Sequence, residues 1–166
     1  MDSNRARLRA ARFPVPGYRR DMGGVERLWA AGRMPSNEGL YRPDDTALEL
    51  HVPGPGAYHY DAGQPIPWRI GGPMDVTALT EDGGDAAYAD FDVALPDGSG
   101  RMTGGSSGMG NIGWIARLNG DGSLRWIAPL WSSNPFTDAR IEGTTGYFTN
   151  DWRNILTLDL TDPALA

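Results

Sequence analysis

The spacing of hydrophobic residues changes along the chain, from a helical period near the N-terminus to a period of two further on. Val25, Leu28 and Trp29 lie at i, i+3 and i+4, which predicts a short helix over residues 24–31 with one apolar stripe. An arginine- and alanine-rich stretch over residues 3–11 also favours a helix, which the prolines after it would end. The N-terminal part therefore predicts one or two short helices.

From residue 46 onward, apolar and polar residues alternate between clusters of glycine, proline, asparagine and aspartate, a pattern typical of short β-strands. The expected strands span residues 47–52, 66–70, 76–80, 86–95, 112–118, 124–130, 139–142, 147–149 and 155–160. The alternation is clearest over residues 86–95. The side chains of that strand expected to face the core are Ala89, Phe91, Val93 and Leu95. Tyr88, Asp90 and Asp92 are expected on its solvent face.

A β-hairpin is the strongest local prediction. Two apolar runs flank the turn sequence of residues 119–122, whose asparagine, aspartate and glycines accept positive φ. In its second strand, Trp126 shares a core face with Leu124 and Ala128, whereas Trp131 is out of phase and is expected to be exposed. The glycine-rich residues 98–113 are expected to form a mobile loop.

Together these patterns predict a mainly β fold: an antiparallel sandwich, a small barrel or a meander, with one or two short N-terminal helices. Residues 1–20 are predicted to be an arginine-rich leader that contributes little to folding, and residues 21–166 a single β-rich domain.

The amino-acid composition excludes some kinds of site and disfavours some kinds of partner. The chain has no cysteine, which excludes disulfides, thiolate zinc sites and thiol nucleophiles. It contains no run of apolar residues long enough for a signal peptide or a membrane span, so a cytoplasmic location is expected. Residues 1–42 carry nine arginines against four acidic residues, and residues 43–166 six arginines against 17 acidic residues. The acidic body disfavours nucleic acid and anionic membranes as partners and favours a basic protein.

Three motifs carry possible chemistry, and each has a simpler explanation. Residues 104–108 match the G-x-S-x-G nucleophile elbow around Ser106, but a strand is expected after them and no histidine follows. Residues 108–113 match G-x-G-x-x-G, again without the helix that dinucleotide binding needs. His51, His59 and Asp61 have no spacing typical of a metal site. We therefore expect no cofactor, no metal site and no catalytic residue.

The C-terminal third of the chain carries one resemblance. Its segments 133–136, 147–150 and 161–163 resemble small uncharacterised actinobacterial β-rich proteins, some of the immunity-protein kind that accompany secreted toxins. The resemblance implies an inhibitor that binds a toxin. It carries no defined motif, so it assigns no functional residue.

The hypothesis favoured by these observations is a non-enzymatic domain that binds another protein, basic in character, in the manner of an immunity-type inhibitor. Exposed aromatic side chains beside polar ones, together with an acidic strand face, are typical of such a surface. The residues expected to contact the partner are Asp90, Asp92, Trp131, Asn134 and Phe136. Two alternatives remain: a carbohydrate or small-molecule module that uses tryptophans around residues 98–113, and a hydrolase or metal-dependent enzyme.

Overall fold

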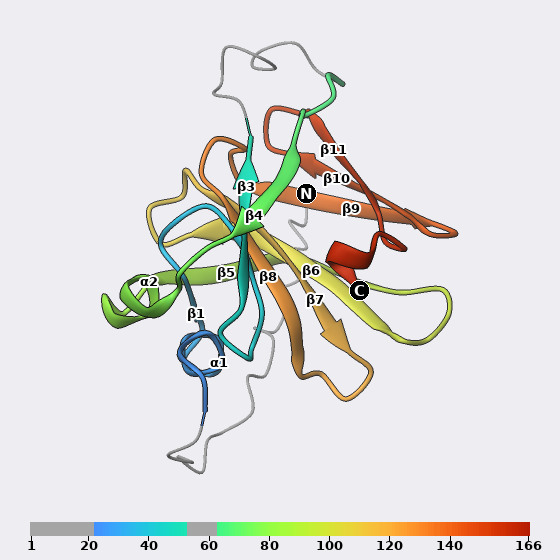
Figure 1. Cartoon of the computed structure of the whole chain (residues 1–166). Helices are drawn as coiled ribbons and strands as arrows, with labels where there is room; N and C mark the ends of the chain where they lie inside the picture. The colour runs from blue at the N-terminus through green and yellow to red at the C-terminus, as the bar shows by residue number, and fades with distance from the viewer. Residues whose placement is uncertain (1–21, 53–62) are drawn as a thin grey trace, which may run out of the picture.

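A computed structural model describes residues 22–52 and 63–166. The predicted leader, the helix expected over residues 3–11, His59 and Asp61 lie outside the described residues. Across the described part of the chain, eleven strands form two antiparallel sheets with few helices, which confirms the mainly β prediction (Figure 1).

The larger sheet has eight strands in the order β1-β5-β6-β7-β8-β2-β3-β4 within the described residues. Its strands are β1 (Arg33–Met34), β2 (Leu40–Tyr41), β3 (Ala47–His51), β4 (Arg69–Pro73), β5 (Asp85–Ala94), β6 (Gly100–Ser107), β7 (Gly113–Asn119) and β8 (Leu124–Leu130). Strands β5 to β8 form a meander, and in the part of the chain that the structure describes the sheet ends at β1 and β4 instead of closing into a barrel. The predicted β7–β8 hairpin is confirmed.

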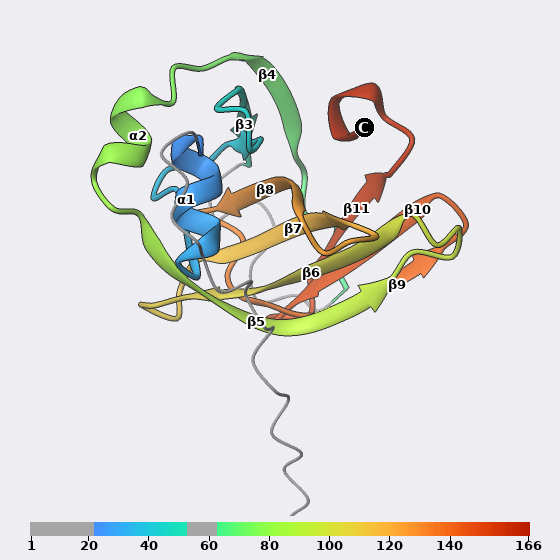
Figure 2. The same cartoon turned by 90° about the horizontal axis from the view of Figure 1, so that it is seen from below.

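The smaller sheet contains β9 (Phe136–Glu142), β10 (Thr145–Asn150) and β11 (Ile155–Asp159), in the order β11-β10-β9. A core between the two sheets, here called the inter-sheet core, contains Phe91, Met102, Trp126 and Phe148 among others. The opposite face of the larger sheet is covered by α1 (Gly24–Ala30) and α2 (Thr77–Glu81), as Figure 2 shows. No helix in the described part of the chain is long and apolar enough to cross a membrane.

Helix α1 confirms the predicted apolar stripe. Its residues Val25, Leu28 and Trp29 are buried, and the Trp29 ring packs edge to face on Trp114 at 5.8 Å between ring centroids. The helix begins after a glycine without a capping side chain, so Asp45 supplies the cap from a distant loop. Its carboxylate accepts the first two helical N–H groups at 2.8 and 2.9 Å. Val25, Trp29 and Trp114 belong to a second core, between the helices and the larger sheet, which we call the helix-side core.

The strand predicted over residues 76–80 is wrong, because these residues form α2. Asp75 accepts a hydrogen bond from the Thr77 N–H at 2.9 Å, a local turn that favours a helix start over an extended strand. Next to it in sequence, the strand expected over residues 66–70 is shifted to Arg69–Pro73.

The prediction of a mobile loop over residues 98–113 is also wrong, since half of this segment is the interior strand β6. Two glycines explain why a strand is possible here. A Cβ on Gly104 would lie 2.6 Å from the Phe91 ring and 2.5 Å from the Trp114 carbonyl oxygen. A Cβ on Gly105 would lie 2.1 Å from the Tyr88 carbonyl oxygen. Glycine lets the neighbouring strands and the Phe91 ring approach β6 closely.

A bulge in β5 changes which side chains face the core. The register shifts between Ala89 and Phe91, leaving Asp90 without a direct partner on β6. Ala87 therefore packs in the helix-side core, whereas Phe91 packs in the inter-sheet core. The core positions predicted for Phe91 and Leu95 are confirmed and Val93 is partly buried, but Ala89 is exposed.

A second register shift, between Arg117 and Leu118, separates Leu124 from Trp126 in the same way. Leu124 lies in the helix-side core, so its predicted face is wrong. Trp126 is fully buried in the inter-sheet core with Ala128, as predicted. Each shift inserts one residue, which inverts the face of every residue beyond it.

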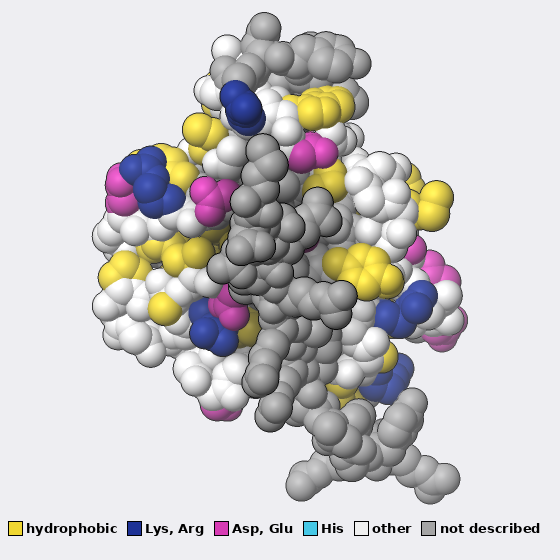
Figure 3. Space-filling model, turned by 180° about the vertical axis from the view of Figure 1, so that it is seen from behind, with side chains coloured by type: hydrophobic (Ala, Val, Ile, Leu, Met, Phe, Trp, Pro, Cys, Tyr) yellow, Lys and Arg dark blue, Asp and Glu magenta, His cyan; other side chains and the backbone are white. Residues whose placement is uncertain are grey.

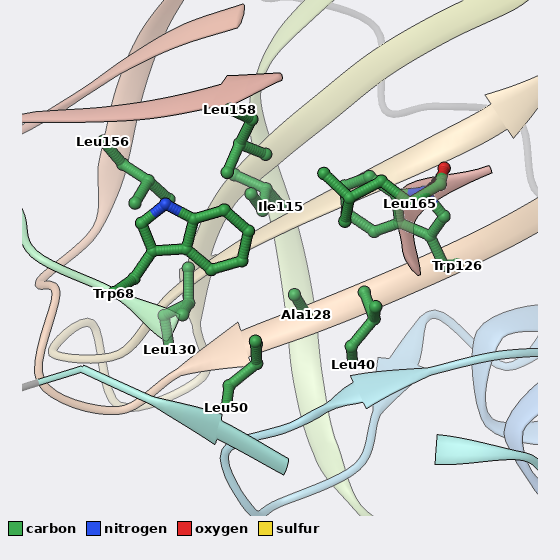
Figure 4. Close-up of a pocket in the computed structure, with 10 residues that line it drawn as sticks. All are labelled: Leu40, Leu50, Trp68, Ile115, Trp126, Ala128, Leu130, Leu156, Leu158 and Leu165. Carbon is green, nitrogen blue, oxygen red and sulfur yellow. Dashed lines mark hydrogen bonds between the residues drawn. The ribbon is translucent and has the colours of Figure 1, made fainter. Parts of the chain in front are cut away.

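The C-terminal turn covers one side of the inter-sheet core. Leu165, in the 3₁₀ turn Pro163–Leu165, is buried beside Trp126 (Figure 4). The Leu165 carbonyl oxygen accepts hydrogen bonds from the Trp126 indole at 2.9 Å and from the Arg117 guanidinium at 3.4 Å. The crevice that these residues help to line has a free volume of about 10 Å³, space for one water at most.

One turn motif, Asp-x-Ser/Thr, recurs along the chain. The aspartate accepts the backbone N–H two residues later at 2.9 to 3.0 Å. The aspartates concerned are Asp44, Asp75, Asp97, Asp121 and Asp159. Hydrogen bonds from the serine or threonine hydroxyl and backbone lower the pKa of each carboxyl below its ordinary value.

These lowered pKa values predict a shared loss of stability in acid. A folded-state pKa below the unfolded one stabilises the fold above the unfolded pKa, about 3.9 for aspartate, and that stabilisation disappears as the pH falls through the folded pKa. Urea unfolding at about pH 6 and about pH 3 tests this. Asp121→Asn keeps an acceptor for Ser123, so we expect it to lose less stability on acidification than wild type. An equal loss would contradict the assignment for Asp121.

Candidate functional site

Exposed hydrophobic side chains gather at one end of the larger sheet. Among the described residues, the large hydrophobic side chains exposed to solvent are Tyr88, Met109 and Trp131, which are 58%, 84% and 51% exposed. Their positions follow from the strand register, in which Tyr88, Ser106, Gly113 and Leu130 lie directly across from one another on β5 to β8. Met109 is in the β6–β7 loop, and Trp131 directly follows Leu130.

These three residues therefore lie at the same end of the sheet. The β6–β7 loop and the segment after β8 lie side by side, opposite the β5–β6 and β7–β8 turns (Figure 1). Four neighbouring strands at about 4.8 Å spacing give the surface a width of about 14 Å. We call Tyr88, Met109, Trp131 and the adjacent Asn134 the sheet-end surface.

Trp131 is exposed, as predicted, and is also held in place. Its indole N–H donates to the Ser36 carbonyl oxygen, and its backbone N–H donates to the Glu38 carboxylate at 2.9 Å. An aromatic side chain fixed before binding loses little conformational entropy when a partner covers it.

The loop that carries Asn134 is well ordered by internal contacts. Asn134 is half-buried and adopts a left-handed conformation with φ of 58°. The buried hydroxyl of Ser133 donates to the Leu130 carbonyl oxygen at 2.7 Å, and the Asn150 side chain donates to the Ser133 carbonyl oxygen at 2.6 Å. Asn134 thus lies at the sheet-end surface on a rigid support.

The expectation that Phe136 is exposed is wrong. Phe136 has no exposed surface and packs in the inter-sheet core as the first residue of β9. The loop ends sooner than its composition indicated, because the left-handed residue Asn134 redirects the chain before Phe136. A side chain with no exposed surface offers a partner nothing to contact.

The two strand aspartates differ in their surroundings. Both are exposed, but Asp92 forms an ion pair with Arg101 at 3.0 Å, which offsets its charge. Asp90 lies at the bulge, with a carboxylate oxygen 2.9 Å from the position of a Cβ on Gly105. Burial raises the pKa of Asp90, and a hydrogen bond with Ser106 lowers it by less. The expected acidic strip is therefore interrupted, and Asp90 is its member nearest Tyr88.

Acidic groups nevertheless flank the sheet-end surface. Glu38 contacts the backbone of Trp131, and the exposed Asp151 donates its N–H to the carbonyl oxygen of Pro135, beside Asn134. Elsewhere the surface is mixed: the view in Figure 3 shows acidic, basic and hydrophobic side chains interspersed over the described part of that face. On that face, acidic character is local to particular residues.

A polar pocket of about 200 Å³ adjoins Glu38. It is lined by Glu38, Glu49, Leu50, His51, Arg69, Gly71 and Met74. Burial raises the pKa of the Glu38 carboxyl above its ordinary value. Hydrogen bonds from the N–H groups of Val52, Trp131 and Ser132, together with the charge of His51, lower that pKa by less. Among the residues that the structure describes, no tryptophan, tyrosine or phenylalanine lines this pocket, unlike the tryptophan-lined site of the carbohydrate alternative.

The motifs for enzymatic chemistry lack their structural context. Ser106 lies within an antiparallel strand, opposite Tyr88 and Gly113, and not at an elbow between a strand and a helix. The G-x-G-x-x-G segment leads into β7 instead of a helix. Within the described residues, no three histidine, aspartate or glutamate side chains gather closely enough to hold a metal ion.

Sequence reasoning found Trp131 and Asn134 but missed Met109 and the contribution of Tyr88. A large apolar residue flanked by glycines, as Met109 is, was a usable signal. Tyr88 is exposed, as predicted, but the bulge puts it on the same face of the sheet as Phe91 and not on the opposite one. Only the register shows that it shares an end with Trp131.

Comparisons with known proteins give no information about the function of either candidate site. The chain's own geometry supplies the two candidate sites, the sheet-end surface and the polar pocket. No protein-family model, curated protein or solved structure matches the chain.

Proposed function

We propose that this chain is a non-enzymatic domain that binds another protein through the sheet-end surface. One observation carries the proposal: the exposed large hydrophobic side chains of the described residues gather at one end of one sheet. Tryptophan, tyrosine and methionine are enriched in protein interfaces.

The charge around this surface supports a basic partner. Glu38, Asp90 and Asp151 flank the hydrophobic side chains. The described residues carry nine arginines against 18 acidic residues, a net charge of −9. Such a field attracts basic proteins and accelerates their association. We further propose that the partner is a toxin, which the chain inhibits in the manner of an immunity protein.

Binding kinetics test the proposal. The partner is first isolated by affinity capture on the wild-type chain, and its association and dissociation rates are then measured at low and high salt. Trp131→Ala is expected to raise the dissociation rate about tenfold or more, because an aromatic anchor acts through burial. Asp90→Arg is expected to slow association at low salt, because it reverses a charge that attracts the partner.

Gly120→Ala is the control, because Gly120 lies in the β7–β8 turn at the opposite end of the sheet and a Cβ there meets nothing closer than 3.8 Å. It should bind as wild type does. Unchanged rates for both Trp131→Ala and Asp90→Arg would show that the partner binds elsewhere. Circular dichroism of each variant verifies that the fold is intact.

A further inference from the structure

The polar pocket beside Glu38 has features that the proposed protein interface does not use. It lies on the β3–β4 hairpin, where His51 pairs with Arg69 across the two strands. Ala47, Glu49 and His51 alternate onto the helix-side face of β3, while Leu48 and Leu50 pack toward the inter-sheet core. The pocket is thus open to solvent on the same side of the sheet as the helices.

Glu38 is a fixed carboxylate of this pocket. One of its oxygens accepts the Val52 N–H at 3.2 Å and the other accepts the Trp131 N–H at 2.9 Å. It is half-buried, whereas Glu49, His51 and Arg69 are exposed. Glu38 therefore presents a negative charge whose position is set by the backbone around it.

Opposite charges line the pocket without neutralising one another. The Glu49 side chain lies over Gly71, where a Cβ would be 2.9 Å from its carboxylate. Within the described residues, Arg69 forms no ion pair with Glu38 or Glu49, although all three line the same space. A ligand between them is attracted by two carboxylates and one guanidinium.

We propose that this pocket binds a small zwitterion of the amino-acid class, with its ammonium group at Glu38 and Glu49 and its carboxylate at Arg69. The volume of about 200 Å³ suits a small metabolite and not a polymer. Met74 supplies an apolar wall for the carbon atoms of the ligand.

The arrangement of charges discriminates between ligand classes. An amine without a carboxylate leaves Arg69 unmatched, and a carboxylate without an amine faces two glutamates. Both are expected to bind at least tenfold more weakly than a zwitterion of the same size. This site does not depend on the protein partner of the sheet-end surface.

Titrations of the full chain test the inference by calorimetry and by backbone amide NMR shifts. The zwitterionic probes are L-alanine, 4-aminobutyrate and 6-aminohexanoate, and the single-charge controls are propylamine and butyrate. At least one zwitterion should shift the amides of β3 and β4 and bind at least tenfold more tightly than both controls. Arg69→Gln and Glu49→Gln should each weaken that binding about tenfold or more, and both positions are exposed, so the fold should persist.

Met109→Ala separates this site from the proposed interface, because Met109 lies in the β6–β7 loop and does not line the pocket. It should leave zwitterion binding within about twofold of wild type while weakening the protein complex. Absence of binding by all three zwitterions, or equal binding by the single-charge controls, would overturn the inference and leave the proposed function untouched. Binding that survives both Arg69→Gln and Glu49→Gln would overturn the assignment of the pocket.

Discussion

Trp126→Ala is expected to lower the free energy of unfolding by about 3 to 5 kcal/mol, the usual range for removing a large buried aromatic side chain. Trp126 is fully buried in the inter-sheet core, and its indole N–H donates to the Leu165 carbonyl oxygen at 2.9 Å. The substitution leaves a cavity and also removes the main hydrogen bond that fixes the C-terminal turn. Chemical denaturation followed by circular dichroism measures the loss.

Two variants separate the causes of that loss. Trp126→Phe keeps an aromatic ring but removes the N–H, leaving Leu165 with only the 3.4 Å contact from Arg117, so we expect an intermediate loss. Trp131→Ala removes an exposed tryptophan and should cost about 1 kcal/mol or less. Equal losses for Trp126→Ala and Trp131→Ala would contradict the assignment of the two faces of β8.

Gly104→Ala is expected to destabilise the protein by about 3 kcal/mol or more, at the upper end of the range for overpacked cores. The new Cβ would lie 2.5 Å from the Trp114 carbonyl oxygen and 2.6 Å from the Phe91 ring. The backbone contact is the harder to relieve, because moving Trp114 means moving β7 away from β6. Thermal and urea unfolding give the change in stability.

Gly72→Ala is the matched control, since Gly72 is also a strand glycine and a Cβ there meets nothing within 4 Å. It should change stability by less than about 0.5 kcal/mol. The double variant Gly104→Ala, Phe91→Leu should recover only part of the loss, because it removes the ring contact and keeps the backbone one. A loss below about 1 kcal/mol for Gly104→Ala alone would show that the space around Gly104 is larger than the structure indicates.

Elements defined by local signals were predictable. Helix α1 follows from the spacing of Val25, Leu28 and Trp29, and the β7–β8 hairpin follows from two apolar runs around an Asn-Gly-Asp-Gly turn. Strand β6 was not predictable in the same way. Its glycines resemble a loop in isolation, and they become strand residues only because Phe91 and the β7 backbone pack against them.

The residues of the candidate sites also differ in whether the sequence could predict them. The phase of Trp131 in its strand was enough to predict its exposure, but Phe136, five residues later, is buried by a turn at Asn134 that composition did not reveal. The polar pocket brings Glu38 together with the distant Glu49, His51 and Arg69 through the pairing of β3 with β4 and the loop before β2. Such pairing depends on register, and four register shifts between the described strands, one of them between β3 and β4, alter the register that simple alternation predicts.

The Asp121 turn has a consequence for how the protein can diversify. Its hydrogen bonds to the Ser123 N–H and hydroxyl are made within the turn, at the end of the sheet opposite Trp131. A self-contained exposed turn tolerates added residues, because lengthening a loop costs little entropy. Insertions can therefore accumulate at one end while the sheet-end surface stays constant. The same separation provides a place to attach a tether or label that leaves that surface facing the solution.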